Sequence, residues 1–329
     1  MKRYLPASCI IIFFILMLLF PQPVFQGASA GLLLWFDMVL PTLLPFIIVS
    51  NLLIQTRAIH WIARILAPVI GRFFGISSYG TFAVLTGFLC GYPMGGKVTA
   101  DLVEHTYISR EEGCYLLSFC NNTSPMFIIS YVIWHNLSDP SLTLPSMTIL
   151  VLSPILCSFL FREYYTHRAY RKTCPCGTGG LRPNKYGGRK AAKISDSVCP
   201  SSAPSENLVD TCIMNGFESI TKVGGYIILF SILLYLMQTV FSGSLVLSAI
   251  LMPSMEITNG IPLICRLPLA AEYRYILAMA LTSFGGWCSV AQTKSMIQKV
   301  NLPVFPYIVE KLITALVTSL LAYVYITFF

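Results

Sequence analysis

Charged residues are scarce in this sequence. The 329 residues include 22 lysines and arginines and 14 aspartates and glutamates, and charged residues make up 11% of the chain. Soluble domains usually carry about 25% charged residues, so the composition excludes an ordinary soluble globular protein. Hydrophobic residues make up 55% of the chain, and the mean hydropathy is +0.71. We therefore predict an all-α polytopic membrane protein.

The sequence also lacks the usual motifs of catalysis and metal binding. Its four histidines are scattered singly, and neither His-Glu-x-x-His nor Gly-x-Ser-x-Gly occurs. Cys174-Pro-Cys176 lacks the Cys-x-x-Cys spacing of zinc sites. Most of the other cysteines lie in apolar segments, where free cysteine behaves as a small hydrophobic residue. We therefore expect no enzyme, no cofactor and no metal site.

Apolar runs predict about six transmembrane helices, because a helix needs about 20 apolar residues to cross a bilayer. Residues 1–30 are interpreted as either a first membrane helix or a signal peptide, since Ala28-Ser-Ala30 is similar to a cleavage signal. The six runs are residues 9–20, 31–55, 113–134, 142–161, 223–240 and 304–329.

A hydrophilic segment, residues 164–207, divides the chain. Residues 162–193 contain nine lysines and arginines and one acidic residue. Because positively charged loops stay in the cytoplasm, we predict a cytoplasmic linker between a first repeat, residues 31–163, and a second, residues 208–329. We expect the linker to lie near anionic lipid and to bind no nucleic acid.

Glycine and proline interrupt several of the apolar segments. Residues 85–101 contain Gly91-Tyr-Pro-Met-Gly-Gly-Lys97, residues 245–264 contain Pro253, and residues 276–299 contain Gly285-Gly286. Glycine and proline disfavour a continuous helix. Irregular backbone at membrane depth is tolerated only where protein buries it or where it lines a cavity. We therefore predict two re-entrant or broken helical elements besides the six spans, one in residues 85–101 and one in residues 276–299.

The two halves of the chain resemble each other. Residues 66–76 align without gaps to residues 251–261, and residues 85–88 align to residues 281–284. Each half has a spanning helix, a proline- and glycine-containing segment, a broken element and another spanning helix. The predicted orientations place the start of the first copy outside and the start of the second inside. The pattern is typical of two inverted repeats in a transporter, with a binding site near the membrane midplane.

The glycine-rich stretch matches the phosphate-loop pattern Gly-x4-Gly-Lys, but Val98 stands where a magnesium-binding serine or threonine belongs. No β-strand is expected before it. We favour an anion site made by amides at a half-helix N-terminus with Lys97 nearby. The alternative is that Lys97 extends to the cytoplasmic interface as an anchor.

Glu256-Ile-Thr-Asn259 places a carboxylate, a hydroxyl and an amide within one helical turn. This group either holds a coupling cation or proton, pairs with a lysine, or only caps a loop. The polar runs 121–125 and 285–292 either bind a solute or satisfy the backbone around the interruptions. The predicted substrate-binding residues are Gly91, Tyr92, Pro93, Gly95, Gly96, Lys97, Asn122, Thr123, Ser124, Glu256, Thr258, Asn259, Gly286, Ser289 and Gln292.

Three motifs together resemble one family. They are residues 91–101, Asn122-Thr-Ser-Pro125 and Glu256-Ile-Thr-Asn-Gly260. They are similar to sporulation integral membrane proteins of the YlbJ type, in the nucleoside-recognition or Gate-domain group, which is distantly similar to concentrative nucleoside transporters. The resemblance covers residues 31–325 apart from the linker. It implies transport of dipicolinate from the mother cell to the forespore across the outer forespore membrane. The residues fit this solute, because amides and Lys97 suit a carboxylate and Tyr92 offers a ring for stacking.

The leading hypothesis is therefore a carrier of a small organic anion, with dipicolinate as the favoured solute, that works by alternating access. One alternative is a carrier of nucleosides or another solute with the same fold. Another is a membrane scaffold that transports nothing and recruits proteins through its basic linker. The expected partners are the anion and membrane lipid, while a coupling cation and a homo-oligomer are left open.

Overall fold

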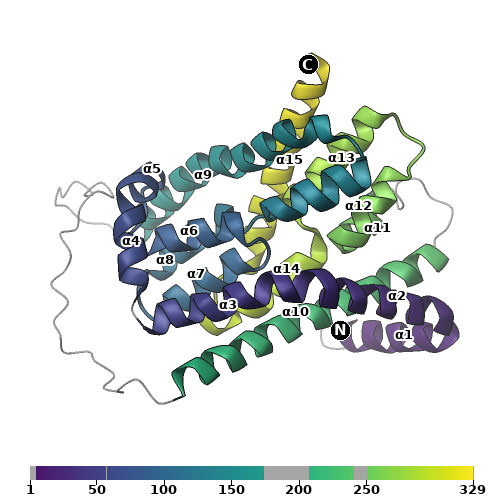
Figure 1. Ribbon diagram of the computed structural model, residues 1–329, viewed down its shortest axis with the longest axis horizontal. Helices are drawn as coiled ribbons and strands as arrows, with labels where there is room; N and C mark the ends of the chain where they lie inside the picture. The colour runs from purple at the N-terminus through teal and green to yellow at the C-terminus, as the bar shows by residue number, and fades with distance from the viewer. Residues whose placement is uncertain (1–4, 57, 174–206, 241–249, 329) are drawn as a thin grey trace.

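The computed structural model describes residues 5–56, 58–173, 207–240 and 250–328. Every regular element in these ranges is helical (Figure 1), which confirms the all-α prediction. Four helices of the described residues are long and apolar enough to cross a bilayer. They are Pro21–Gln55, Pro140–Tyr165, Leu208–Val240 and Val304–Phe328.

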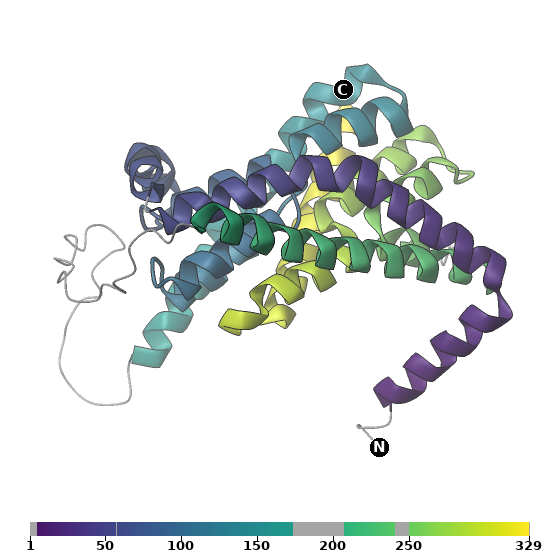
Figure 2. The same cartoon turned by 60° about the horizontal axis from the view of Figure 1, so that its bottom comes forward.

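Two of these long helices lie side by side (Figures 1 and 2). The first is continuous through α2 (Pro21–Leu34), the π-helical turn η1 (Trp35–Val39) and α3 (Leu40–Gln55), and it packs along α10 (Leu208–Val240). The two backbones approach closely at Gly27 and Gly31, where an added Cβ would lie 2.8 Å from a Cα atom of α10. The helix passes without interruption through the cleavage-like residues 28–30.

The other two long helices are α9 (Thr143–Thr173) and α15 (Val304–Phe328). Helix α15 runs through the middle of the molecule (Figure 1) and packs against α9, α8 (Arg110–Cys120) and α13 (Ala271–Phe284). Its position brings one face of α15 against the interrupted helices of both halves.

Four pairs of short helices are each separated by an interruption, which we call a helix break. The breaks are residues 90–93, residues 121–124, residue 256 and residue 285. The first separates α6 (Gly80–Leu89) from α7 (Met94–Glu104), and the second separates α8 from η3 (Phe127–Leu137). The third separates α11 (Met252–Met255) from α12 (Ile257–Cys265), and the fourth separates α13 from α14 (Gly286–Ile297).

Two of the six expected spans take another form. The first expected run becomes α1 (Leu5–Leu19), which has 15 residues, fewer than the number that usually crosses a bilayer. Residues 113–134 are interrupted at the second break, because Ser124 caps the following helix with its hydroxyl, which accepts a hydrogen bond from Phe127 N at 3.3 Å. The expectation of six spans is therefore not confirmed, and four long helices are found in the described residues.

The boundaries of the expected linker also shift. Helix α9 continues to Thr173 and α10 begins at Leu208, so the helices occupy the first ten residues of the expected segment and extend well before residue 223. Residues 174–206 lie outside the described residues.

Short helices cover one end of the molecule. They are α4 (Ile59–Leu66), η2 (Ala67–Gly71) and α5 (Arg72–Phe74), and α4 packs on α6. The loop before α6 is fixed to α8, because Ser77 N donates a hydrogen bond to Glu112 Oε1 at 2.7 Å. The remaining short elements are η4 (Pro140–Leu142) and η6 (Gln298–Val300).

Candidate functional site at the helix breaks

The α6–α7 hairpin closes on the end of α8. A Cβ at either Gly87 or Gly95 would overlap the carbonyl oxygen of Cys120, so this oxygen lies between glycines from both arms of the hairpin. At the tip, Gly91 has a φ of +87°, and a Cβ there would lie 2.9 Å from Ser124 N. The first and second breaks are therefore in direct contact, and they require the small size and positive φ that glycine provides.

The fourth break joins the first two. Tyr92 donates its hydroxyl proton to the carbonyl oxygen of Ser283 at 2.7 Å, and Thr123 donates to the carbonyl oxygen of Thr282 at 2.6 Å. Gly285 has a φ of +83°, and a Cβ there would come within 2.6 Å of the Tyr92 ring. The C-terminal end of α13 is thus hydrogen-bonded to both breaks of the first half.

The third break completes the group. A Cβ at Gly286 would lie 2.9 Å from the carbonyl oxygen of Ser254 and 3.5 Å from Ile257 N. All four breaks therefore form one contiguous region that combines segments far apart in the sequence. We call it the break cluster, and it consists of residues 90–93, 121–124, 254–257 and 282–286.

Helix α15 turns a polar stripe toward the break cluster. Tyr307, Lys311, Thr314 and Thr318 follow helical spacing, and all four are buried. Thr318 donates to the hydroxyl oxygen of Ser283 at 2.9 Å. The stripe was not among the predicted site residues, although an ionisable side chain within an apolar span is a signal of function.

Lys311 places a buried cation at the break cluster. The residue is 1% exposed, and its Nζ donates to the carbonyl oxygen of Asn121 at 2.9 Å and to Asn122 Oδ1 at 3.3 Å. The Nζ atom also lies 4.9 Å from the centroid of the Tyr92 ring, within the range of a cation–π interaction. Its partners are thus the unwound backbone, an amide and an aromatic face.

Asn121 ties four helices together at the second break. Its Nδ2 donates to Thr293 Oγ1 at 2.9 Å and to the Tyr307 hydroxyl at 2.8 Å. Its Oδ1 accepts a hydrogen bond from Gly96 N at 3.2 Å. Because Asn121 has no solvent exposure, these bonds replace water and fix α7, α14 and α15 around the end of α8.

Glu256 is the N-cap of α12, and it is only 2% exposed. Its carboxylate accepts hydrogen bonds from Thr258 N at 3.1 Å and Asn259 N at 2.8 Å, and also from the Thr258 hydroxyl and the Asn259 amide. The Asn259 amide also donates to Ser231 Oγ of α10 at 3.0 Å. The carboxylate oxygens therefore face neutral N–H and O–H donors, which is the chemistry of a helix cap.

Lys97 lies against α3 instead of facing the breaks. Its Nζ forms a salt bridge with Asp101 Oδ2 at 2.7 Å and donates to Asn51 Oδ1 at 3.2 Å, and the residue is 8% exposed. The nearby backbone amides of Met94 and Lys97 donate to Gly91 and Pro93 carbonyl oxygens at 2.9 and 3.0 Å. The predicted anion site at the start of α7 thus already has protein partners.

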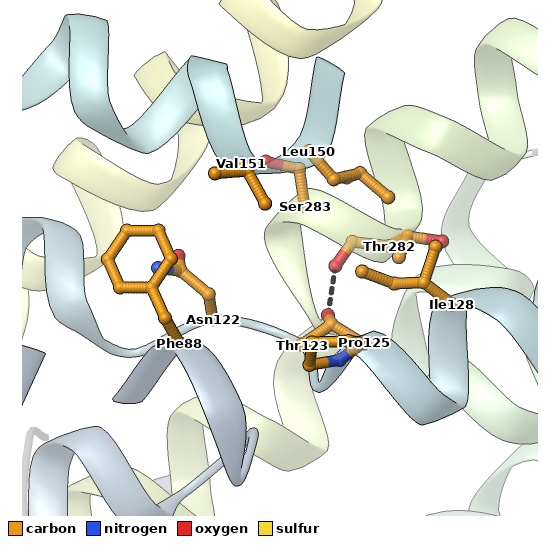
Figure 3. A pocket seen from close by; sticks show the side chains of 9 residues that line it. All are labelled: Phe88, Asn122, Thr123, Pro125, Ile128, Leu150, Val151, Thr282 and Ser283. Carbon is orange, nitrogen blue, oxygen red and sulfur yellow. Dashed lines mark hydrogen bonds between the residues drawn. The ribbon is translucent and has the colours of Figure 1, made fainter. Parts of the chain in front are cut away.

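A small pocket opens beside the break cluster (Figure 3). One wall carries the Phe88 ring and the Asn122 amide, and the opposite side carries Thr282 and Ser283. The Thr123–Thr282 hydrogen bond crosses one edge of the pocket (Figure 3). Its full lining is Phe88, Asn122, Thr123, Pro125, Ile128, Leu150, Val151, Thr282 and Ser283.

The predicted residues Gly96, Ser289 and Gln292 do not line this pocket. On α14, Ser289 Oγ donates to the carbonyl oxygen of Gly286 at 2.9 Å, and Gln292 Nε2 donates to Cys288 Sγ at 3.3 Å. Gly96 of α7 packs against Thr293 of α14, because a Cβ added at Gly96 would lie 3.0 Å from Thr293 Cγ2. Among the described residues, no group of three or more His, Cys, Asp or Glu side chains could hold a metal ion.

Comparison with known proteins identifies a relative of this sequence. The sporulation integral membrane protein YlbJ of Bacillus subtilis is 26% identical to this chain over 314 residues, which are 89% of this chain and 75% of the relative. This similarity supports membership of the chain in the YlbJ family. No family model matches the sequence, and no solved structure matches it. The chain is an integral membrane protein, as its apolar helices also indicate.

Proposed function

We propose that this YlbJ-family protein carries a small organic anion across a membrane during sporulation. The observation that carries the proposal is the contact of four helix breaks beside a partly polar pocket. Broken helices at the interface of two repeats are how many transporters build a solute site near the midplane. Buried irregular backbone also costs stability unless it is satisfied, so four such breaks at one place favour a function over chance.

Dipicolinate is the anion that we propose. The family supports this choice, because the sequence resembles YlbJ-type proteins, and the outer forespore membrane is the corresponding location. The chemistry of the region suits a planar aromatic dicarboxylate. Phe88 and Tyr92 offer aromatic faces, while Asn122, Thr123 and Ser283 offer polar groups within the same small region. The residues at the break cluster are therefore the proposed solute contacts.

We propose two inverted repeats as the basis of alternating access. The order of elements supports them. In the first half α3, the α6–α7 pair, the α8–η3 pair and α9 follow one another, and in the second half α10, the α11–α12 pair, the α13–α14 pair and α15 do so. In this order α6 corresponds to α11, and α8 corresponds to α13. Residues 85–88 lie in α6 and residues 281–284 lie in α13, so the short sequence match between them does not join corresponding helices.

The test is uptake of labelled dipicolinate, and separately of uridine, by proteoliposomes that contain the purified protein, with an imposed proton or sodium gradient. We expect protein-dependent uptake of dipicolinate that exceeds uptake of uridine. Uptake of uridine alone would replace this proposal with the nucleoside carrier. Uptake of neither solute by monodisperse, folded protein would contradict a carrier and favour the membrane scaffold.

A further inference from the structure

We infer that Lys311 neutralises the charge of the transported anion. This inference rests on the proposed function and identifies the charged contact within the same site. It replaces Lys97, the lysine that the sequence motif favours, with a residue from the last membrane helix. The solute class that it selects is a small aromatic carboxylate.

The first argument is the charge balance around Lys311. Its two hydrogen-bond acceptors, Asn121 O and Asn122 Oδ1, are neutral. The adjacent Glu310 accepts instead from the Tyr165 hydroxyl of α9, at 2.6 Å. No carboxylate of the described residues forms a salt bridge with Lys311. Neutral dipoles solvate an ammonium group but leave its charge uncompensated in a region of low dielectric, so an arriving carboxylate would be stabilised there.

The second argument is the contrast with two other lysines, one on α7 and one on α10. Lys97 is paired with Asp101 at 2.7 Å, and Lys222 of α10 is paired with Glu218 at 2.6 Å. An anion that bound either lysine would have to compete with a resident carboxylate four residues away. Lys311 has no such competitor among the described residues, and its cationic charge therefore favours an incoming anion.

The third argument is access from the pocket. Asn122 lines the pocket (Figure 3) and accepts the longer of the two Lys311 hydrogen bonds, at 3.3 Å. A carboxylate that displaces Asn122 Oδ1 would reach Nζ without breaking the shorter bond to the backbone of Asn121. The Tyr92 ring, 4.9 Å from Nζ, and the Phe88 ring on the pocket wall would then lie near an aromatic solute. Thus a cationic group and an aromatic ring lie together next to a residue that lines the pocket.

The experiment measures equilibrium binding of three pyridine solutes that differ in charge. They are dipicolinate with two carboxylates, picolinate with one, and pyridine-2,6-dicarboxamide with none. The variants are Lys311→Met, Lys311→Gln, Lys311→Arg and Lys97→Met. Lys222→Met is the matched control, because it removes an exposed, ion-paired lysine by the same substitution. Thermal unfolding of each purified variant reports whether it is folded.

We expect Lys311→Met and Lys311→Gln to weaken dipicolinate binding about 10-fold to 100-fold, the usual effect of losing a hydrogen bond to a charged group. Picolinate binding should also weaken, and any binding of the neutral dicarboxamide should be unchanged. Lys311→Arg should retain most dipicolinate affinity, since it keeps the charge. Lys222→Met should bind like the wild type.

Three results would overturn the inference. In the first, folded Lys311→Gln binds dipicolinate as the wild type does. In the second, Lys311→Arg loses as much affinity for dipicolinate as Lys311→Gln does, which would indicate that binding depends on the size and shape of the lysine side chain and not on its charge. In the third, Lys97→Met causes the selective loss of anion binding. Failure of the wild type itself to bind dipicolinate would instead contradict the proposed function, so the two failures are distinguishable.

Discussion

Gly87→Ala tests the packing that brings the first two helix breaks together. The glycine lies in α6, and an added Cβ would overlap the carbonyl oxygen of Cys120 at the end of α8. The obstacle is backbone, and the carbonyl carbon of Cys120 would also lie only 2.7 Å away. Relief therefore requires α6 or α8 to move as a unit, because no flexible side chain can turn aside.

The expected effect follows from two opposing contributions. Forced overpacking in a well-packed region typically costs about 1–3 kcal/mol, occasionally more. Replacing a helical glycine by alanine gains up to about 1 kcal/mol from helix propensity. The matched control is Gly225→Ala on α10, where an added Cβ meets no atom within 4 Å. The control should keep the propensity gain alone, so the two variants should differ in unfolding free energy by about 1–3 kcal/mol.

The assay is thermal unfolding of both purified variants in one detergent, followed by intrinsic fluorescence, with the wild type alongside. We expect Gly87→Ala to unfold at a lower temperature than the wild type and Gly225→Ala at the same or a higher temperature. Equal unfolding temperatures for the two variants would refute the close contact between the α6–α7 hairpin and the end of α8.

Two further predictions concern buried polar groups. Asn121→Ala leaves Gly96 N without its side-chain acceptor and should lower the unfolding free energy by about 1–3 kcal/mol. The control is Asn215→Ala, which removes an exposed asparagine side chain. An equal or smaller loss of unfolding free energy in Asn121→Ala than in this control would contradict the prediction. Burial raises the pKa of the Glu112 carboxyl despite the hydrogen bond from Ser77. The stability from this group is therefore greatest below its unfolded pKa, about 4.3, and is lost as pH rises through the folded pKa. The unfolding temperature of Glu112→Gln should therefore increase relative to that of the wild type as the pH rises above about 4.3. A difference in unfolding temperature that does not depend on pH would contradict this prediction.

The sequence predicts the breaks best where glycine and proline mark them. Gly91, Pro93 and Gly285 occur inside apolar segments, and the backbone changes direction at each of these positions. These residues act locally, through positive φ or a missing N–H, so their effect can be read without knowledge of the fold.

The contacts of the second break were harder to predict than its position because they are tertiary. Residues 113–134 are long enough for a span with a polar run inside it, and Asn121 bonds to Thr293 and Tyr307 of distant segments. The sequence around Asn121 does not indicate these distant partners. By contrast, the Lys97–Asp101 pair has the four-residue spacing that favours a salt bridge on one helix face, so this partner was visible in the sequence.

The role of Lys311 could be predicted from the sequence only in part. It lies in a helix whose length and hydropathy predict a plain span, and an ionisable residue there was a signal of function. Its neighbours, however, come from α6–α7 and α8, more than 180 residues away in the chain. Only the fold connects the lysine with the glycine-rich motif.

The most direct measurement of the central claim is a structure of the protein determined with saturating dipicolinate. We predict density for the solute beside the break cluster, with one carboxylate within hydrogen-bonding distance of Lys311 Nζ and the ring near Tyr92 or Phe88. Density between α3 and α7 beside Lys97, or a break cluster empty while dipicolinate occupies another site, would contradict the claim.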